Sequence, residues 1–283
     1  MELKKKTQVL QIRGDRQEET SASLVQEVPL TIFLNGREVV TLLCTGHHLD
    51  DLTLGFLKSE GLMDSTGELK SLQVDEEAGV ARVSLHQEVT LKQTLHMKRT
   101  LGSGCGRASL YYQPLDALQI SPIKSSLSLR VSQIRERMSE MNQASSLYKK
   151  TRGTHNASLA QAERILVSRE DIGRHNAADM IVGYAMRNGI DLSDKMLLTT
   201  GRASSEIVIK AARVAIPVLV SRSAPTHLGV AIADRVGMTL VGYVRGNRMT
   251  LYAHPQRVKK TQPVSDISVQ DLDELVKRTA IES

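Results

Sequence analysis

One cysteine of this chain lies in a setting that favours thiol chemistry. Cys105 belongs to the run Thr100-Leu-Gly-Ser-Gly-Cys-Gly-Arg-Ala-Ser, with a glycine on either side and Arg107 two residues further on. Flanking glycines expose a thiol and leave backbone N–H groups free, and a nearby guanidinium favours the reactive thiolate. A lone cysteine can also be an inert loop thiol, so the pattern predicts a reactive group without naming its reaction.

The other cysteine, Cys44, ends the apolar run Val39-Val-Thr-Leu-Leu-Cys and is expected to be a small buried hydrophobe. Two cysteines in such different contexts argue against a disulfide and fit a reducing compartment. No apolar run is long enough to cross a bilayer, and Met1-Glu-Leu-Lys-Lys-Lys is not followed by an apolar signal region. We therefore expect a cytoplasmic protein without a membrane partner.

Three stretches combine small polar residues with one arginine each. They read Asp171-Ile-Gly-Arg-His-Asn, Thr199-Thr-Gly-Arg-Ala-Ser-Ser and Ser221-Arg-Ser-Ala-Pro-Thr, and each joins a strand-like run to a helix-like run. Parallel strands end at one edge of a sheet, so Arg174, Arg202 and Arg222 are expected to converge there beside helix N-termini, a geometry that suits phosphate. The alternative is that each arginine pairs with a local carboxylate and each serine caps a helix.

The overall charge agrees with an anionic ligand. The net charge is +6 and the pI is near 9.3, which favours either a nucleic-acid surface or a pocket for a smaller polyanion. An aromatic content of 3% and the absence of a nucleic-acid-binding motif make nucleic acid the weaker alternative. No Cys-x-x-Cys or His-x-x-x-His spacing occurs, so no metal site is predicted, and His155 and His175 are interpreted as ligand contacts.

The apolar spacing predicts the domains that position these residues. Residues 1–25 lack apolar periodicity and are expected to be a disordered tail. Residues 26–110 are predicted to form a small α+β domain, with a hairpin around Asn35-Gly36, a helix from Thr45 to Gly61, two more strands and the cysteine loop at its end. Residues 111–258 are predicted to form a larger α/β domain, and residues 259–283 a polar tail that can hold a short helix.

Strand-like and helix-like runs alternate in the larger domain, which predicts a parallel or mixed sheet covered by helices. The expected elements are a helix from Leu127 to Met141, strands at Arg164–Val167, Lys195–Thr200, Pro217–Val220, Thr239–Val244 and Arg248–Tyr252, and helices that begin near Arg174, near Ser204 and after Pro225.

The polar stretches, taken in order, resemble one protein family. Asp171-Ile-Gly-Arg-His-Asn-Ala-Ala-Asp, Thr200-Gly-Arg-Ala-Ser-Ser-Glu, Ser221-Arg-Ser-Ala-Pro-Thr and Gly242-Tyr-Val-Arg-Gly-Asn-Arg-Met-Thr-Leu-Tyr are similar to the motifs of the FdhD family of formate dehydrogenase accessory proteins. The resemblance extends through Gly153-Thr-His, the cysteine loop, Leu54-Gly-Phe-Leu-Lys-Ser-Glu-Gly and the Asn35-Gly hairpin. It covers about residues 27 to 258.

This resemblance implies a sulfur carrier. Such a protein accepts persulfide sulfur from a cysteine desulfurase, here on Cys105, and delivers it to the molybdenum bis-(molybdopterin guanine dinucleotide) cofactor before insertion into formate dehydrogenase. It further implies sulfurtransferase activity, a homodimer, guanine nucleotides as surrogate ligands and a larger domain of three layers similar to the cytidine deaminase fold. Deaminase chemistry does not carry over, because Ala177 stands two residues after His175, where a catalytic Glu would be required.

The chain departs from the family pattern at the cysteine loop. Many members have Cys-x-x-Cys there, whereas Gly102 and Ala108 stand three residues to either side of Cys105. A persulfide needs one thiol, but a single cysteine cannot resolve it through an internal disulfide. The second hypothesis is therefore a cofactor-binding chaperone whose cysteine is not catalytic.

The family resemblance and the three arginine-bearing stretches together predict a cofactor site at one edge of the larger sheet. The predicted contacts are Arg174, His175, Asn176, Gly201, Arg202, Ser204, Ser221, Arg222, Ser223, Tyr243, Val244, Arg245, Gly246, Asn247 and Arg248.

Overall fold

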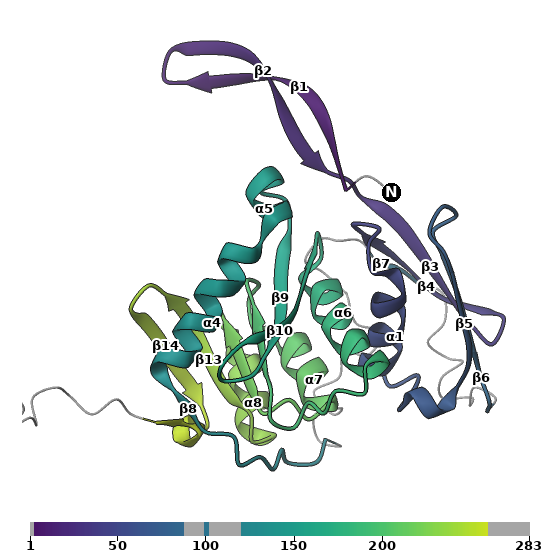
Figure 1. The fold of residues 1–283 in the computed structure, drawn as a ribbon, viewed down its shortest axis with the longest axis vertical. Coiled ribbons are helices and arrows are strands. Elements are labelled where there is room, and N and C mark those ends of the chain that lie inside the picture. The colour runs from purple at the N-terminus through teal and green to yellow at the C-terminus, as the bar shows by residue number, and fades with distance from the viewer. Residues whose placement is uncertain (1–2, 88–98, 102–119, 260–283) are drawn as a thin grey trace, which may run out of the picture.

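The computed structural model describes residues 3–87, 99–101 and 120–259. In this part of the chain, two β-sheets are joined through a pair of helices, and a long hairpin projects from one end (Figure 1). Cys105, the predicted domain boundary near residue 110 and the helix expected in the C-terminal tail lie outside the described residues.

The smaller sheet contains five strands in the order β5-β6-β3-β4-β7. The predicted hairpin around Asn35-Gly36 is confirmed, and both residues adopt the positive φ of a tight hairpin turn. The alternating apolar residues of β3 bury one face of the sheet against the helix α1, whose Leu52 and Phe56 are completely enclosed. The elements are β3 (Val28–Leu34), β4 (Arg37–Cys44), α1 (Leu49–Ser59), β5 (Leu69–Asp75), β6 (Val80–Leu85) and β7 (Arg99–Leu101).

The larger sheet contains six strands in the order β10-β9-β11-β12-β13-β14. The mixed sheet expected from the sequence is confirmed: β10, β11, β12 and β13 run in one direction, whereas β9 and β14 run in the opposite one. Its strands are β9 (His155–Ala160), β10 (Ile165–Asp171), β11 (Met196–Thr199), β12 (Val218–Ser221), β13 (Thr239–Arg245) and β14 (Arg248–Ala253).

Helices cover both faces of the larger sheet (Figure 1). Successive residues of β11 point to opposite faces, so Leu197 packs with the helices α6, α7 and α8 while Leu198 packs with α4. The helices are α4 (Val131–Ala144), α5 (Ser146–Thr151), α6 (Arg174–Arg187), α7 (Ser205–Arg213) and α8 (His227–Arg235). The short strands β8 (Leu129–Arg130) and β15 (Val258–Lys259) pair in parallel and hold the end of the described chain beside the start of α4.

The two sheets meet where α1 crosses α6 at very short distance. A Cβ atom on Gly55 would lie 1.7 Å from the carbonyl oxygen of Asp179, and one on Gly183 would lie 1.8 Å from that of Asp51. Only glycine allows the two backbones to approach so closely. This contact explains the glycine in the stretch Leu54-Gly-Phe-Leu.

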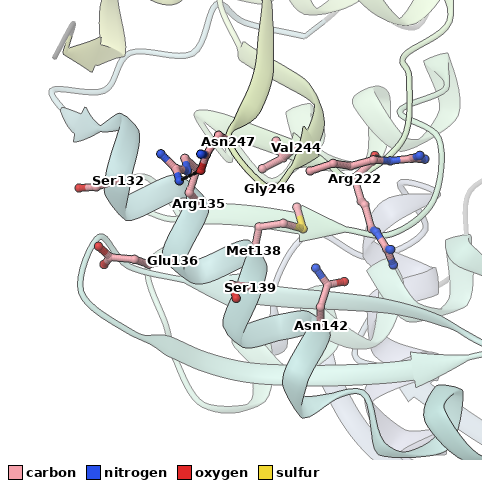
Figure 2. A pocket seen from close by; sticks show the side chains of 11 residues that line it. Ser132, Arg135, Glu136, Met138, Ser139, Asn142, Arg222, Val244, Gly246 and Asn247 are labelled. Atoms are coloured by element: carbon pink, nitrogen blue, oxygen red, sulfur yellow. Dashed lines mark hydrogen bonds between the residues drawn. The ribbon is translucent and has the colours of Figure 1, made fainter. Parts of the chain in front are cut away.

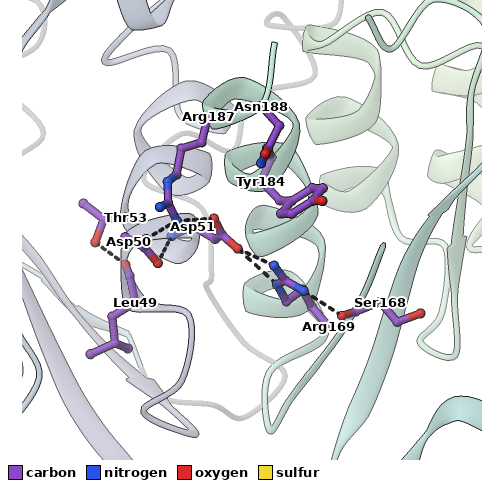
Figure 3. Close-up of polar contacts among 9 residues, drawn as sticks. All are labelled: Leu49, Asp50, Asp51, Thr53, Ser168, Arg169, Tyr184, Arg187 and Asn188. Carbon is purple, nitrogen blue, oxygen red and sulfur yellow. Dashed lines mark hydrogen bonds and ion pairs between the residues drawn. The ribbon is translucent and has the colours of Figure 1, made fainter. Parts of the chain in front are cut away.

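Buried charges reinforce the same helix crossing. Asp51, which is 1% exposed, accepts hydrogen bonds from Arg169 on β10 and from Arg187 on α6 (Figure 3). Deeper in the interface, the ammonium of Lys210 on α7 lies 2.9 Å from Glu60 and 3.0 Å from Asp179. Burial alone would lower the pKa of Lys210, but the two carboxylates outweigh it and raise this pKa. The lysine therefore keeps its charge.

The expectation of a disordered N-terminal tail is wrong. The strands β1 (Lys4–Arg13) and β2 (Arg16–Val25) form an antiparallel hairpin paired along its whole length around Gly14, whose φ is +60°. Both faces of this hairpin are largely exposed, with Leu10 and Ile12 more than half accessible to solvent. Because neither face is buried, its sequence lacks the alternation that identifies a strand.

Candidate functional site

Six strand ends meet at one edge of the larger sheet. The carboxyl ends of β10 to β13 lie there, and the amino ends of β9 and β14 join them because these two strands are antiparallel to their neighbours. Backbone hydrogen bonds tie the connecting loops together: Arg222 N–H donates to Thr199 O at 2.9 Å, and Tyr243 N–H donates to Ser223 O at 3.1 Å. The convergence of the three arginine-bearing junctions is confirmed.

Two adjoining cavities open between this edge and the helices α4 and α5. The α4 cavity has a volume of about 550 Å³ and lies between α4 and the β13–β14 turn (Figure 2). The α5 cavity, of about 710 Å³, lies further along the edge. The α4 cavity is lined by Ser132, Arg135, Glu136, Met138, Ser139, Asn142, Arg222, Val244, Arg245, Gly246 and Asn247, and the α5 cavity by Asn142, Ser145, Tyr148, Lys149, Arg152, Gly153, Thr154, His155, Asn156, Ile172, Thr200, Arg222, Ser223 and Arg245.

Arg222 and Arg245 line both cavities and, together with Asn142, form their common wall. The Nε of Arg245 donates to the carbonyl oxygen of Arg222 at 3.2 Å, and its guanidinium lies 5.3 Å from the ring of Tyr243. Tyr243 has a φ of +57°, which is unusual for an aromatic residue and marks a locally strained backbone at the edge. Fixed guanidinium groups at such a wall suit a ligand with phosphate groups.

The structure brings six of the predicted contacts to the cavities, namely Arg222, Ser223, Val244, Arg245, Gly246 and Asn247. Asn247 is held by a hydrogen bond from Arg135 on α4. Ser221 acts behind them, because its hydroxyl donates to Gly201 O at 2.7 Å and accepts from Ser223 N–H at 2.9 Å. Tyr243 and Arg248 are exposed beside the β13–β14 turn.

The other predicted contacts line neither cavity, and several of them hold the edge from behind. Asn176 donates to Leu43 O and to Asp171, both at 2.8 Å, and so fastens α6 to the smaller sheet. Gly201 packs under Arg174, since a Cβ on it would lie 2.8 Å from that side chain. Arg202 is exposed, and Ser204 is the residue that precedes α7.

His175 is paired inside the protein. Its Nε2 lies 2.9 Å from Glu206 on α7, and both side chains are largely buried. Burial, with the neighbouring cations Arg174 and Lys210, lowers the pKa of His175 in spite of Glu206. This histidine connects α6 to α7 beneath the arginine-bearing loops.

The wall formed by α4 and α5 was missed by sequence reasoning. Asn142 and Lys149 line the α5 cavity from these helices, and Arg152 lines it from the position after α5. His155, interpreted from the sequence as a ligand contact, lines the same cavity together with Asn156 from the first residues of β9. The stretch Gly153-Thr-His, which matches a family motif, was the signal that could have extended the site to this side.

A buried junction connects the smaller sheet to the cavities. Thr45, just after β4, donates from its backbone N–H and its hydroxyl to the carboxylate of Asp171, at 2.8 and 3.0 Å. Ile172, the residue that follows Asp171, lines the α5 cavity. Burial raises the pKa of Asp171 to about 6, although hydrogen bonds from Gly173, Thr45 and Asn176 act against the shift. Burial, with a smaller contribution from Asp171, also raises the pKa of Cys44 to about 12. Cys44 is therefore an unreactive core thiol, as predicted.

Comparison with known proteins identifies the family. Residues 25–259 match the FdhD/NarQ family. The chain belongs to this family. The sulfur carrier protein FdhD of Bacillus subtilis strain 168 is 38% identical over 237 residues, which cover 84% of this chain and 90% of the relative. That of Staphylococcus aureus strain MRSA252 is 39% identical over 239 residues, with the same coverage.

A solved structure of a formate dehydrogenase accessory protein has the same fold. The crystal structure described as that of a formate dehydrogenase accessory protein from Desulfotalea psychrophila superposes with a TM-score of 0.77 at 27% identity, and the match covers 91% of this chain and all of that one. The N-terminal hairpin up to Leu24 precedes the part of this FdhD/NarQ chain that matches the family. Among the described helices, none is both long and apolar enough to cross a membrane.

Proposed function

We propose that this FdhD/NarQ protein is a sulfur carrier for formate dehydrogenase. In this proposal, Cys105 accepts sulfur from a cysteine desulfurase, and the sulfur passes to the molybdenum bis-(molybdopterin guanine dinucleotide) cofactor, which is bound as cargo in the two adjoining cavities. The main support for this proposal is the arginine wall shared by the two cavities. It consists of Arg222 and Arg245, and both residues belong to stretches that resemble the family motifs. The names of the curated relatives support the sulfur carrier role.

The charge of the cavities fits a ligand with two diphosphate groups. Lys149, Arg152, Arg222 and Arg245 line the α5 cavity, and none of the described residues that line it is acidic. Guanidinium groups bind phosphate oxygens in pairs, with charge-assisted hydrogen bonds that are stronger than neutral ones. An elongated dinucleotide can occupy both cavities and keep its phosphates at Arg222 and Arg245.

The last described residue before the cysteine loop supports the role proposed for Cys105, because it lies near the junction of the two sheets. Leu101 pairs with Leu42 in β4, two residues before Cys44 and close to the junction of Thr45 with Asp171. Four residues of chain, the separation between Leu101 and Cys105, span about 14 Å at most. Our proposal requires that this span bring Cys105 within reach of a ligand at the sheet edge.

The oligomeric state, the cellular location, the partners and the fold type that the family resemblance implies belong to the same proposal. We infer a homodimer in the cytoplasm that receives sulfur from a cysteine desulfurase, without a membrane or nucleic-acid partner. We also infer that residues 111–258 form a domain of the cytidine deaminase type, and the helices on both faces of the larger sheet support this description.

Persulfide formation tests the proposal directly. The thiolate of Cys105 attacks the outer sulfur of the desulfurase persulfide, so that one S–S bond forms as another breaks and the desulfurase thiolate leaves. After incubation with a desulfurase and cysteine, intact-mass spectrometry is expected to show one added sulfur atom on the parent protein and on Cys44→Ala. The same addition should be missing from Cys105→Ala, and a parent protein that gains no sulfur would refute the proposal.

The arginine wall gives a matched pair of variants. Arg222→Lys keeps the charge but removes the paired hydrogen bonds to phosphate, so GDP affinity is expected to fall about tenfold, the equivalent of one charge-assisted hydrogen bond. Arg202→Lys is the control, because Arg202 is exposed and lines neither cavity. Isothermal titration calorimetry measures both affinities. Equal affinities in the two variants would place the diphosphate elsewhere.

A further inference from the structure

The α5 cavity contains an imidazole in a cluster of cations. His155 lines the cavity from the first position of β9 and is partly buried. Lys149 and Arg152 face the same space from α5 and its end, and Arg222 and Arg245 face it from the sheet edge. Among the described residues of the lining, Tyr148 is the remaining titratable one.

The groups around His155 disfavour its charged form. Burial, followed by the positive charge of Arg174 and the neighbouring His175 on α6, lowers the pKa of His155. Asp171 is its partner in the register of β9 and β10, but that carboxylate accepts hydrogen bonds from Thr45, Gly173 and Asn176. Glu170 accepts hydrogen bonds from the backbone N–H groups at the start of α5. Both carboxylates are thus engaged by other partners.

We propose that the α5 cavity is a binding site for a phosphate-like dianion, and that a proton binds to His155 together with this ligand. The bound dianion supplies the negative charge that is missing from the described residues of the lining. The inference rests on the proposed function in so far as the natural ligand is a phosphate group of the cofactor. The site itself would accept any tetrahedral dianion of that size.

The hydrogen bonding around His155 accommodates both protonation states. Its Nδ1 lies 3.5 Å from the hydroxyl oxygen of Thr200, and that oxygen already accepts the backbone N–H of Asn156 at 2.9 Å. A hydroxyl can rotate to donate to neutral Nδ1 or can accept from protonated Nδ1. Nε2 is then the ring nitrogen that serves the ligand in either state.

The proposal predicts in which direction the affinity for the dianion changes with pH. Without ligand, His155 is neutral at pH 7 because its pKa is lowered. A bound dianion raises the pKa, so proton and anion favour each other's binding. Affinity is therefore highest below the pKa of the free protein, falls as the pH rises through the interval between the free and bound values, and is constant above it.

The test uses sulfate as the probe, because it stays a dianion throughout the range. Imidazole NMR of the full-length protein at constant ionic strength is expected to show the pKa of His155 rise by about one unit at saturating sulfate. A rise of one unit corresponds to about tenfold tighter sulfate binding at a pH well below the pKa of His155 in the free protein than at a pH well above its pKa in the complex. Calorimetry measures that ratio independently.

Two variants separate His155 from other groups. His155→Gln should bind sulfate with an affinity that no longer changes over this range, although it retains Asp171, whose pKa of about 6 lies within it. His86→Gln, at an exposed position after β6, should behave like the parent. Absence of sulfate binding to the parent, an unchanged pKa with sulfate bound, or the same pH dependence in His155→Gln would each overturn the inference. Persulfide formation on Cys105 is unaffected by these outcomes, so a failure here remains distinguishable from failure of the sulfur carrier role.

Discussion

Cys105→Ala is expected to abolish the restoration of formate dehydrogenase activity in cells that lack their own FdhD/NarQ protein. The chain has two cysteines, and the structure removes Cys44 from consideration because its thiol is completely buried with a pKa of about 12. A thiol that is neither exposed nor ionised cannot attack a persulfide. In the proposed function, sulfur transfer by this chain therefore depends on Cys105 alone. The measurement is formate dehydrogenase activity in the complemented strain, at matched protein levels.

The control for this experiment is Cys44→Ala. It removes a small side chain from the core of the smaller sheet, so a modest loss of stability without loss of complementation is expected. If Cys105→Ala complements as well as the parent, sulfur relay through Cys105 is ruled out, and the chain acts as a cofactor-binding chaperone. GDP binding to Cys105→Ala should be unchanged, which separates binding from sulfur transfer.

Lys210→Met is expected to destabilise the protein by about 3–5 kcal/mol, because it leaves Glu60 and Asp179 buried without their cation. Methionine has a similar length, so the change removes the charge with little effect on packing. Chemical denaturation measures the loss of unfolding free energy. Lys58→Ala is the matched control: Lys58 pairs with the exposed Asp64, and such surface pairs contribute about 0–1 kcal/mol.

The effect of Lys210→Met should depend on pH in one direction. Burial, with a smaller contribution from Glu60, raises the pKa of Asp179, and Lys210 acts against this shift, so the pKa in the folded state rises further without the ammonium. Protonated Asp179 is compatible with the fold below its unfolded pKa near 4, and this compatibility is lost as pH rises through the folded value. The variant should thus lose less stability under acidic conditions than at neutral pH. A loss of stability that does not depend on pH would contradict the role assigned to Lys210 as the cation that neutralises Glu60 and Asp179.

Much of the larger sheet could be predicted because its strands are short apolar runs between polar junctions. Leu197, Leu198, Leu219 and Val220 are buried on alternating faces, and a strand covered on both sides requires such a continuous run. The glycine, arginine and serine residues that follow each strand then had to meet at one edge. The positions of these strands and the convergence of the polar junctions after them thus follow directly from the local pattern of apolar and polar residues.

β9 could not be recognised from the same pattern. It carries Asn156 and Ser158, polar residues that are completely or almost completely buried. Asn156 donates to Ser145 at 2.7 Å, and Ser158 bonds to Ser168 of β10 at the same distance. Polar side chains satisfied by partners in other elements remove the apolar signal of a strand. His155 was therefore interpreted as a ligand contact without a strand to position it, and the α5 wall of the site was not predicted.

Sequence also cannot distinguish a residue that contacts ligand from one that supports it. Arg222 and Asn176 both lie in polar motifs, yet Arg222 lines both cavities and Asn176 joins α6 to the smaller sheet. The same hydrogen-bonding groups serve both purposes, and only the fold determines which way they point.

The crossing of α1 and α6 has a consequence for biosynthesis. When α1 leaves the ribosome, the cations that neutralise its buried carboxylates have not yet been synthesised. Arg169, which pairs with Asp51, follows it by 118 residues, and Lys210, which pairs with Glu60 just after α1, follows that residue by 150. Burying these carboxylates without their cations is unfavourable, so the N-terminal half of the chain cannot complete its packing during its own synthesis. The newly made chain should acquire both sheets together, late in translation, and nascent chains that end before Lys210 should depend on chaperones.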